Sequence, residues 1–170
     1  MLADASGVMP EALKFEGDKT FFTAALDRAD LIVHGKHSHE GQPNSPLRRR
    51  IVLTRKISGV ADDPSSPKTT LWNPTGAPFE TACAHAGVGA GTIAIIGGPS
   101  VFDMFMDRYD TFWLSQAPNV RLPDGEPVFS GVPQRTPQQV LASHGLNPGP
   151  SQLLDANHSV TVTPWLRTTP

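Results

Sequence analysis

The chain has 170 residues and a mass of 18.2 kDa, a length that fits one domain, which we expect to span residues 1–170. Only 18% of the residues are charged and the formal net charge is -2, which argues against a nucleic-acid-binding protein and against a disordered charged tail. No apolar run approaches the roughly 20 residues of a membrane helix, and the N-terminus lacks a secretory signal pattern, so we expect a cytoplasmic protein without membrane contact.

Short apolar runs separated by Gly and Pro predict an α/β fold. Continuous β-branched runs predict buried strands at 31–33, 51–54 and 93–96, and more alternating or weaker runs predict strands at 69–72, 111–114 and 160–163. Helical spacing predicts helices at 18–26, at 79–86 before Gly87, and at 99–107 with Pro99 in the first turn. We interpret 61–68 and 118–150 as loops and short extended pieces.

Two glycines follow the predicted strand at 93–96, and a predicted helix begins directly after them. Gly97 and Gly98 carry no β-carbons, so a ligand can approach the backbone, and the first turn of a helix offers unpaired N–H groups. The pattern indicates a site for phosphate or pyrophosphate. The alternative is that the pair only permits a tight turn. The run is not a G-x-G-x-x-G fingerprint, so it does not favour a Rossmann domain.

Positive charge is concentrated between residues 36 and 56. Six of the fourteen Lys and Arg residues lie there, and Glu40 is the only acidic residue among them; the six are Lys36, Arg48, Arg49, Arg50, Arg55 and Lys56. Local potential steers a ligand more than total charge does, so the stretch predicts contact with an anion. The alternative is a solvated sheet edge that resists aggregation.

Three histidines, His34, His37 and His39, lie within six residues. Such a cluster can bind a transition metal, but no regular helix or strand would bring all three rings to one point, so we expect no metal site. We interpret His37 and Ser38 as hydrogen-bond donors to phosphate. Asp18 precedes Phe21 and Phe22 at the predicted helix start, where it is either an N-cap or an acid in an apolar pocket.

The order of these motifs resembles the dihydrofolate reductase fold family. Asp18-Lys19-Thr20-Phe21-Phe22 is similar to the family's D-x-x-(W/F)-F, and Gly35-Lys36-His37-Ser38 to its G-R-(K/H)-T. Leu53-Thr54-Arg55 is similar to L-(S/T)-x, and Gly97-Gly98-Pro99-Ser100-Val101-Phe102 to G-G-x-x-(V/L)-Y. The stretch 122–129 looks more like the broader group that includes the reductase domain of riboflavin biosynthesis.

The resemblance implies a three-layer sandwich with a mostly parallel central sheet and an antiparallel C-terminal strand. The family opens with a strand in the middle of its sheet, and residues 1–10 look like the tail of that strand and the loop after it, so we expect a truncated first strand. Three explanations remain open: the start lies upstream, residues 1–5 supply a stub, or a partner fills the gap.

The resemblance also implies an NADPH-dependent reductase that transfers hydride to a pterin-like or ribosylated pyrimidine heterocycle. Asp18 would orient or protonate the substrate ring, with Phe21 and Phe22 as an apolar wall. The implied cofactor residues are Gly35, Lys36, His37 and Ser38 at a phosphate, Thr54 and Arg55 at the adenosine phosphate, and Gly97, Gly98, Pro99, Ser100, Val101 and Phe102 at the pyrophosphate and nicotinamide. Lys36 replaces the usual Arg, and Phe102 replaces Tyr.

Two other functions compete with the reductase. One is a non-catalytic or regulatory domain that keeps the fold, and the other is a metal-binding module that uses the histidine cluster. The exposed edge of an open sheet also predicts a homodimer.

Overall fold

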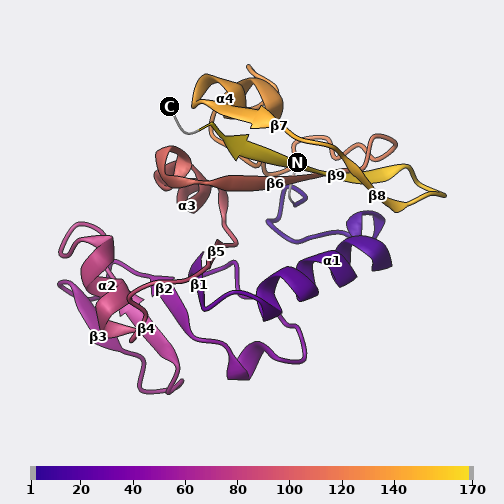
Figure 1. Ribbon diagram of the computed structural model, residues 1–170. Helices are drawn as coiled ribbons and strands as arrows, with labels where there is room; N and C mark the ends of the chain where they lie inside the picture. Colours follow the sequence, from indigo (N-terminus) through magenta and orange to yellow (C-terminus); the bar gives the residue numbers. More distant parts are fainter. Residues whose placement is uncertain (1–2, 169–170) are drawn as a thin grey trace. The chain divides into compact units, whose positions relative to one another are not determined.

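The computed structural model describes residues 3–168, which form two compact units (Figure 1). Unit 1 combines the N-terminal segment up to Phe22 with the segment from Phe102 onward, and unit 2 is Thr23–Val101. Unit 2 is therefore continuous in sequence and lies, along the chain, between the two segments that form unit 1. A single domain over residues 1–170 stays our prediction for a chain of this length.

Unit 2 is built on a mostly parallel sheet with the strand order β3-β4-β2-β1-β5. The strands β1, β2, β4 and β5 are parallel, and β3 is antiparallel to β4. Leu31, Ile32, Val33 and Ile51 are fully buried, which explains why their strands are continuously apolar in sequence. The bounds are β1 Leu31–Gly35, β2 Arg50–Leu53, β3 Val60–Asp62, β4 Thr69–Trp72 and β5 Ile93–Ile95.

A helix packs on this sheet, and two others connect unit 2 to unit 1 along the chain. Helix α2 (Phe79–His85) buries Phe79 and Ala82, and the Phe79 ring lies 5.3 Å from that of Trp72. The chain leaves α2 through Gly87, whose φ of 72° suits glycine. Helices α1 (Glu16–Asp27) and α3 (Pro99–Met104) each contain a point where the chain passes from one unit to the other, and η2 is Ser45–Leu47.

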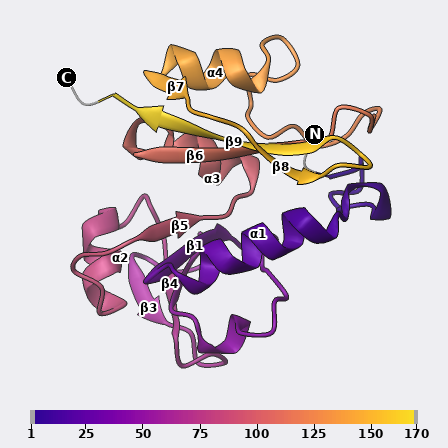
Figure 2. The ribbon, with the colours of Figure 1, turned by 45° about the vertical axis from the view of Figure 1, so that its right-hand side comes forward.

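Unit 1 contains an antiparallel sheet in which β9 (Val160–Arg167) pairs with β6 (Thr111–Gln116), β7 (Leu146–Pro148) and β8 (Gln152–Asp155). Helix α4 (Pro137–Ser143) lies against β7 (Figure 2). The short 3-10 turns η1 (Glu11–Leu13) and η3 (Met106–Arg108) complete the unit. Its buried apolar side chains include Phe112, Leu114, Phe129, Leu141 and Trp165.

The expected strands and helices are confirmed, with small differences at their ends. The interpretation of 61–68 and 118–150 as loops and short extended pieces agrees with the short strands β3, which ends in the first stretch, and β7, which lies in the second. It is wrong for α4, which is a helix. Helix α4 buries only Val140 and Leu141, so its sequence gives no clear periodic signal. A capping box between Thr136 and Gln139 stabilises α4 instead.

The N-terminal segment holds no strand before α1 within the described residues, where Ala3 forms only an isolated bridge with Glu126. Ala3 is buried, and its carbonyl accepts a 2.9 Å hydrogen bond from the Glu126 N–H. The first two residues of the predicted stub at 1–5 lie outside the described residues. None of the helices in residues 3–168 combines the length and the hydropathy that a bilayer-spanning helix requires.

Candidate functional site

Three neighbouring parallel strands of unit 2 end at the same edge of the sheet. Strand β1 lies between β2 and β5, and Gly35 at the end of β1 is in register with Leu53 at the end of β2, while Val33 is in register with Ile95. The residues that follow these strands therefore share one edge. We call 35–38, 54–56 and 97–101 the carboxyl edge. Ligands of open α/β sheets bind at the carboxyl ends of strands.

Glycines let two turns of the carboxyl edge approach each other closely. The Gly35 N–H donates a 2.7 Å hydrogen bond to the Gly97 carbonyl, and the Gly97–Gly98 peptide bond is cis. A β-carbon at Gly98 would lie 3.2 Å from Ser38 Oγ, and one at Gly35 would lie 3.4 Å from Val101 Cγ2. Any side chain at position 98 would therefore fill space beside the Ser38 hydroxyl. Pro99 and Ser100 follow in the first turn of α3, with Ser100 exposed.

The carboxyl edge carries exposed cations. Lys36, Arg55 and Lys56 are exposed, and none of them has an ion-pair partner within residues 3–168. Thr54 fixes the turn 54–56, which carries Arg55 and Lys56. Its N–H donates to the Trp72 carbonyl at 2.9 Å, and its Oγ1 accepts from the Lys56 N–H at 3.2 Å. His37 is exposed on the neighbouring turn. This edge therefore keeps a local positive charge in a chain whose net charge is negative.

The other arginines of the cationic stretch do not join this edge, so the prediction that the whole stretch meets an anion is wrong for Arg48, Arg49 and Arg50. Arg50 opens β2, and Arg48 and Arg49 precede it, so their backbone lies at the amino end of the strand. The Arg49 side chain donates to the Ala86 carbonyl at 2.8 Å. Arg48 and Arg50 are buried and paired with acids, as described next.

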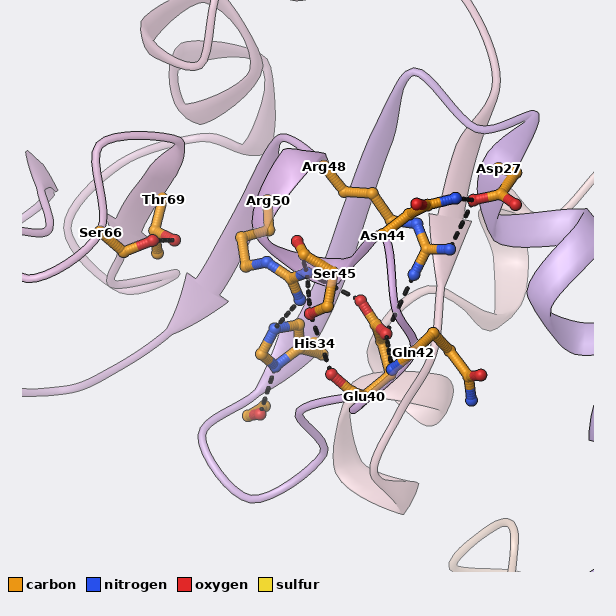
Figure 3. A network of polar contacts seen from close by, with 11 residues as sticks. Asp27, His34, Glu40, Gln42, Asn44, Ser45, Arg48, Arg50, Ser66 and Thr69 are labelled. Carbon is orange, nitrogen blue, oxygen red and sulfur yellow. Dashed lines mark hydrogen bonds and ion pairs between the residues drawn. The ribbon is translucent and has the colours of Figure 1, made fainter.

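Glu40 pairs with both buried arginines (Figure 3). Its Oε1 lies 2.8 Å from Arg50 Nη2 and its Oε2 lies 3.0 Å from Arg48 Nη1, while Asp27 accepts from Arg48 Nη2 at 2.6 Å. Burial acts to raise the pKa of Glu40, but hydrogen bonds from Arg50, the Gln42 N–H and Arg48 hold that pKa below its ordinary value. Two positive and two negative charges thus compensate one another inside unit 2.

The three histidines of the sequence cluster have different environments. His34 is buried in β1, with its Nδ1 2.8 Å from the Gly35 carbonyl and its Nε2 3.2 Å from Arg50 Nη1. His37 and His39 are exposed, and the His39 ring lies 5.8 Å from that of His34. Within residues 3–168, no group of three or more His, Cys, Asp or Glu side chains is arranged to hold a metal ion.

Asp18 and the two phenylalanines belong to unit 1. Helix α1 begins at Glu16, so Asp18 is its third residue and the N-cap interpretation is wrong. The Asp18 side chain is half-buried. Its Oδ1 accepts a 2.5 Å hydrogen bond from Ser115 Oγ, and the Phe21 ring lies 5.2 Å from that of Trp113 at an angle of 64°. Trp113 and Ser115 alternate on β6, so they share one face of that sheet.

The sequence gives no signal that Ser115 and Trp113 lie near Asp18 and Phe21, because Ser115 is 97 residues away from Asp18. Phe22 is half-buried on α1. Phe102 also belongs to unit 1, where its ring lies 5.5 Å from Phe112 and 6.4 Å from Phe129. The predicted site residues are therefore divided. Unit 2 holds, at its carboxyl edge, residues 35–38, Thr54, Arg55 and 97–101. Unit 1 holds Asp18, Phe22 and Phe102.

Comparison with solved structures finds a dihydrofolate reductase from Enterococcus faecalis complexed with NADP(H) and RAB-propyl. The TM-score is 0.59 and the sequence identity 16%, over 98% of this chain and 93% of that chain. The chain therefore has a dihydrofolate reductase-like fold, as its motifs predict. No protein-family model and no curated protein matches the sequence.

Proposed function

We propose that this protein is an NADPH-dependent reductase that transfers hydride to a pterin-like or ribosylated pyrimidine heterocycle. One observation carries the proposal. The exposed Lys36, Arg55 and Lys56, without ion-pair partners in residues 3–168, lie at the same sheet edge as the Gly97–Gly98 turn and the Ser38 hydroxyl. A dinucleotide with a pyrophosphate and a 2'-phosphate offers anionic groups to match this edge. The solved dihydrofolate reductase, whose fold is similar, was complexed with NADP(H).

The residues at the carboxyl edge fit a pyrophosphate. The missing β-carbon at Gly98 leaves space beside Ser38 Oγ, where a phosphate oxygen can accept a hydrogen bond from the hydroxyl. Lys36 and His37 supply further donors on the same turn. Gly35 and Gly97 keep the two turns together through their 2.7 Å backbone hydrogen bond.

Arg55 is the residue that we expect to select the phosphorylated cofactor. It is exposed and follows Thr54 at the end of β2, so its guanidinium is available to a 2'-phosphate. A guanidinium grips a phosphate with two parallel hydrogen bonds, which a lysine cannot do. NADH lacks this phosphate. The same residue should therefore contribute little to NADH binding.

NADPH, when bound, supplies the hydride, and the protein supplies binding, orientation and electrostatics. In unit 1, the Ser115 hydroxyl holds the Asp18 carboxylate by donating to Oδ1, which leaves Oδ2 to accept from a ring N–H or amino group of a nitrogen heterocycle. Phe21 and Phe22 provide an apolar wall on the same helix. The stretch 122–129 supports the riboflavin-biosynthesis group of substrates.

The proposal is tested by titrating the wild-type protein and Arg55→Ala with NADPH and NADH in a calorimeter. Hydrogen bonds to a charged group contribute about 1.5–3 kcal/mol, so the NADPH Kd of Arg55→Ala should rise about 10- to 100-fold while the NADH Kd stays nearly constant. Arg49→Ala is the matched control, because Arg49 lies at the amino end of the same strand. Equal losses for both nucleotides in Arg55→Ala would count against the 2'-phosphate role, and a folded wild-type protein that binds neither would support a non-catalytic domain.

A further inference from the structure

We propose that His34 is a positioning residue that holds the turn 35–38 in the shape required to bind phosphate. The inference rests on the proposed function, because that function assigns the turn 35–38 to phosphate. His34 itself is a buried side chain outside the predicted site residues. His34 lies in β1, directly before Gly35, and its ring connects the buried arginine network to the backbone of the turn (Figure 3).

The contacts of the two ring nitrogens allow only one neutral tautomer. The Gly35 carbonyl can only accept, so His34 Nδ1, which lies 2.8 Å from it, must carry a hydrogen and donate. The Arg50 guanidinium can only donate, so His34 Nε2, which lies 3.2 Å from Nη1, must be the acceptor. Both neighbours independently require the tautomer with hydrogen on Nδ1.

Arg50 is itself held from several sides, so it is a fixed donor for His34. Its Nη2 donates to Glu40 Oε1 at 2.8 Å and to the carbonyl and hydroxyl oxygens of Ser45, both at 2.9 Å. His34, Glu40 and Arg50 are at most 6% exposed, so water does not compete for these contacts. A continuous series of hydrogen bonds therefore runs from Glu40 through Arg50 and His34 to Gly35.

His34 remains neutral in this setting. Burial lowers its pKa below the ordinary value, and the Arg50 charge acts in the same direction, against the opposing effect of the Gly35 carbonyl. A neutral ring is what the geometry requires, because a protonated ring would direct an N–H group at the Arg50 guanidinium.

The Gly35 carbonyl accepts two hydrogen bonds, one from His34 Nδ1 and one at 3.0 Å from the Ser38 N–H, which closes the turn. The turn carries Lys36 and Ser38, the donors that we assign to phosphate. A group that is already held in its binding shape pays less conformational entropy when the ligand arrives. His34 therefore preorganises the turn without touching the ligand.

Two substitutions separate the two contacts of the ring. In His34→Asn the side-chain amide can place its N–H near the position of Nδ1, which retains the donor to Gly35 and removes the acceptor for Arg50. In His34→Gln the amide reaches the position of Nε2, which retains the acceptor for Arg50 and removes the donor to Gly35. If His34 only stabilised the core through Arg50, His34→Gln would preserve the protein better than His34→Asn. Positioning of the turn requires the opposite order.

The experiment measures two properties of the wild type, His34→Asn and His34→Gln. In the absence of ligand, hydrogen exchange of the Ser38 amide should be near the wild-type rate in His34→Asn and about 10-fold faster in His34→Gln, because only His34→Gln loosens the turn. The NADPH Kd should stay within about 3-fold of wild type in His34→Asn and rise about 10-fold or more in His34→Gln. Equal values for the two variants, or the reverse order, would overturn the proposal.

The wild-type protein gives a further test that does not depend on the folding of any variant. A nitrogen-15 spectrum of the imidazole should show a hydrogen on Nδ1 and none on Nε2 of His34, and the opposite tautomer would overturn the proposal. If the wild type binds no NADPH, the proposed function fails. The tautomer and the Ser38 exchange rates then decide independently whether His34 holds the turn.

Discussion

Replacing Glu40 by Ala should destabilise the protein strongly, because it removes one carboxylate that two buried arginines share. The side chain of Glu40 is 3% exposed, and those of Arg48 and Arg50 are 6% and 5% exposed. Removal of one partner from a buried ion pair costs about 3–5 kcal/mol, since the remaining charge stays buried. Arg50 keeps Ser45 and Arg48 keeps Asp27, so we expect the lower end, about 3 kcal/mol.

For a chain of this size, a loss of about 3 kcal/mol lowers Tm by about 6–12 °C. The assay is urea unfolding at pH 7, followed by circular dichroism. Glu40→Gln is the conservative variant, which retains one acceptor and should lose less unfolding free energy than Glu40→Ala. Glu11→Ala is the exposed control, with a side chain 87% exposed beside Lys14, and should change the unfolding free energy by less than about 0.5 kcal/mol. A loss in Glu40→Ala no larger than that of the control would refute the shared ion pair.

Three further predictions concern the site and its pH dependence. Gly98→Ala should weaken NADPH binding about 10-fold or more by placing a β-carbon 3.2 Å from Ser38 Oγ, and unchanged calorimetric affinity would disprove the proposed pyrophosphate site beside Gly98. Asp18→Asn should lower turnover while Tm stays within about 2 °C, whereas a fall in Tm with normal turnover would make Asp18 a structural residue only. Because the pKa of folded His34 is lowered, its contribution to stability is present above about pH 6.5 and is lost as pH falls toward the folded pKa. Urea unfolding at pH 7 and pH 5.5 should therefore show a smaller pH-dependent loss in His34→Asn than in wild type, and an equal loss would contradict the assignment.

The sequence predicts those elements of the fold whose burial is visible as a pattern. Strand β1 is buried on both faces over Leu31, Ile32 and Val33, so it reads as a continuous apolar run. Gly87 marks the end of α2 through its positive φ. Strands β3 and β7 are too short for periodicity, and α4 depends on the capping box at Thr136 more than on an apolar stripe.

The carboxyl edge of the site is predictable for a related reason. Its motifs lie at the ends of parallel strands, so the fold alone brings Gly35, Thr54 and Gly97 to one edge. Side-chain pairing is not predictable in this way. Arg50 and Arg55 are close in sequence, but Glu40 neutralises the charge of Arg50 in the interior, whereas Arg55 is exposed. The contact of Asp18 with Ser115 depends on packing between distant segments and has no local signal.

Backbone amide shifts during a titration with NADPH test the nucleotide site most directly, since they report where on the sheet the ligand binds. The amides of Gly35, Ser38 and Gly98 should shift in proportion to occupancy, while those of Arg49 and Lys68 at the opposite end of the strands should not. Shifts confined to Arg49 and Lys68, or no shifts at saturating NADPH, would contradict a nucleotide site at the carboxyl edge.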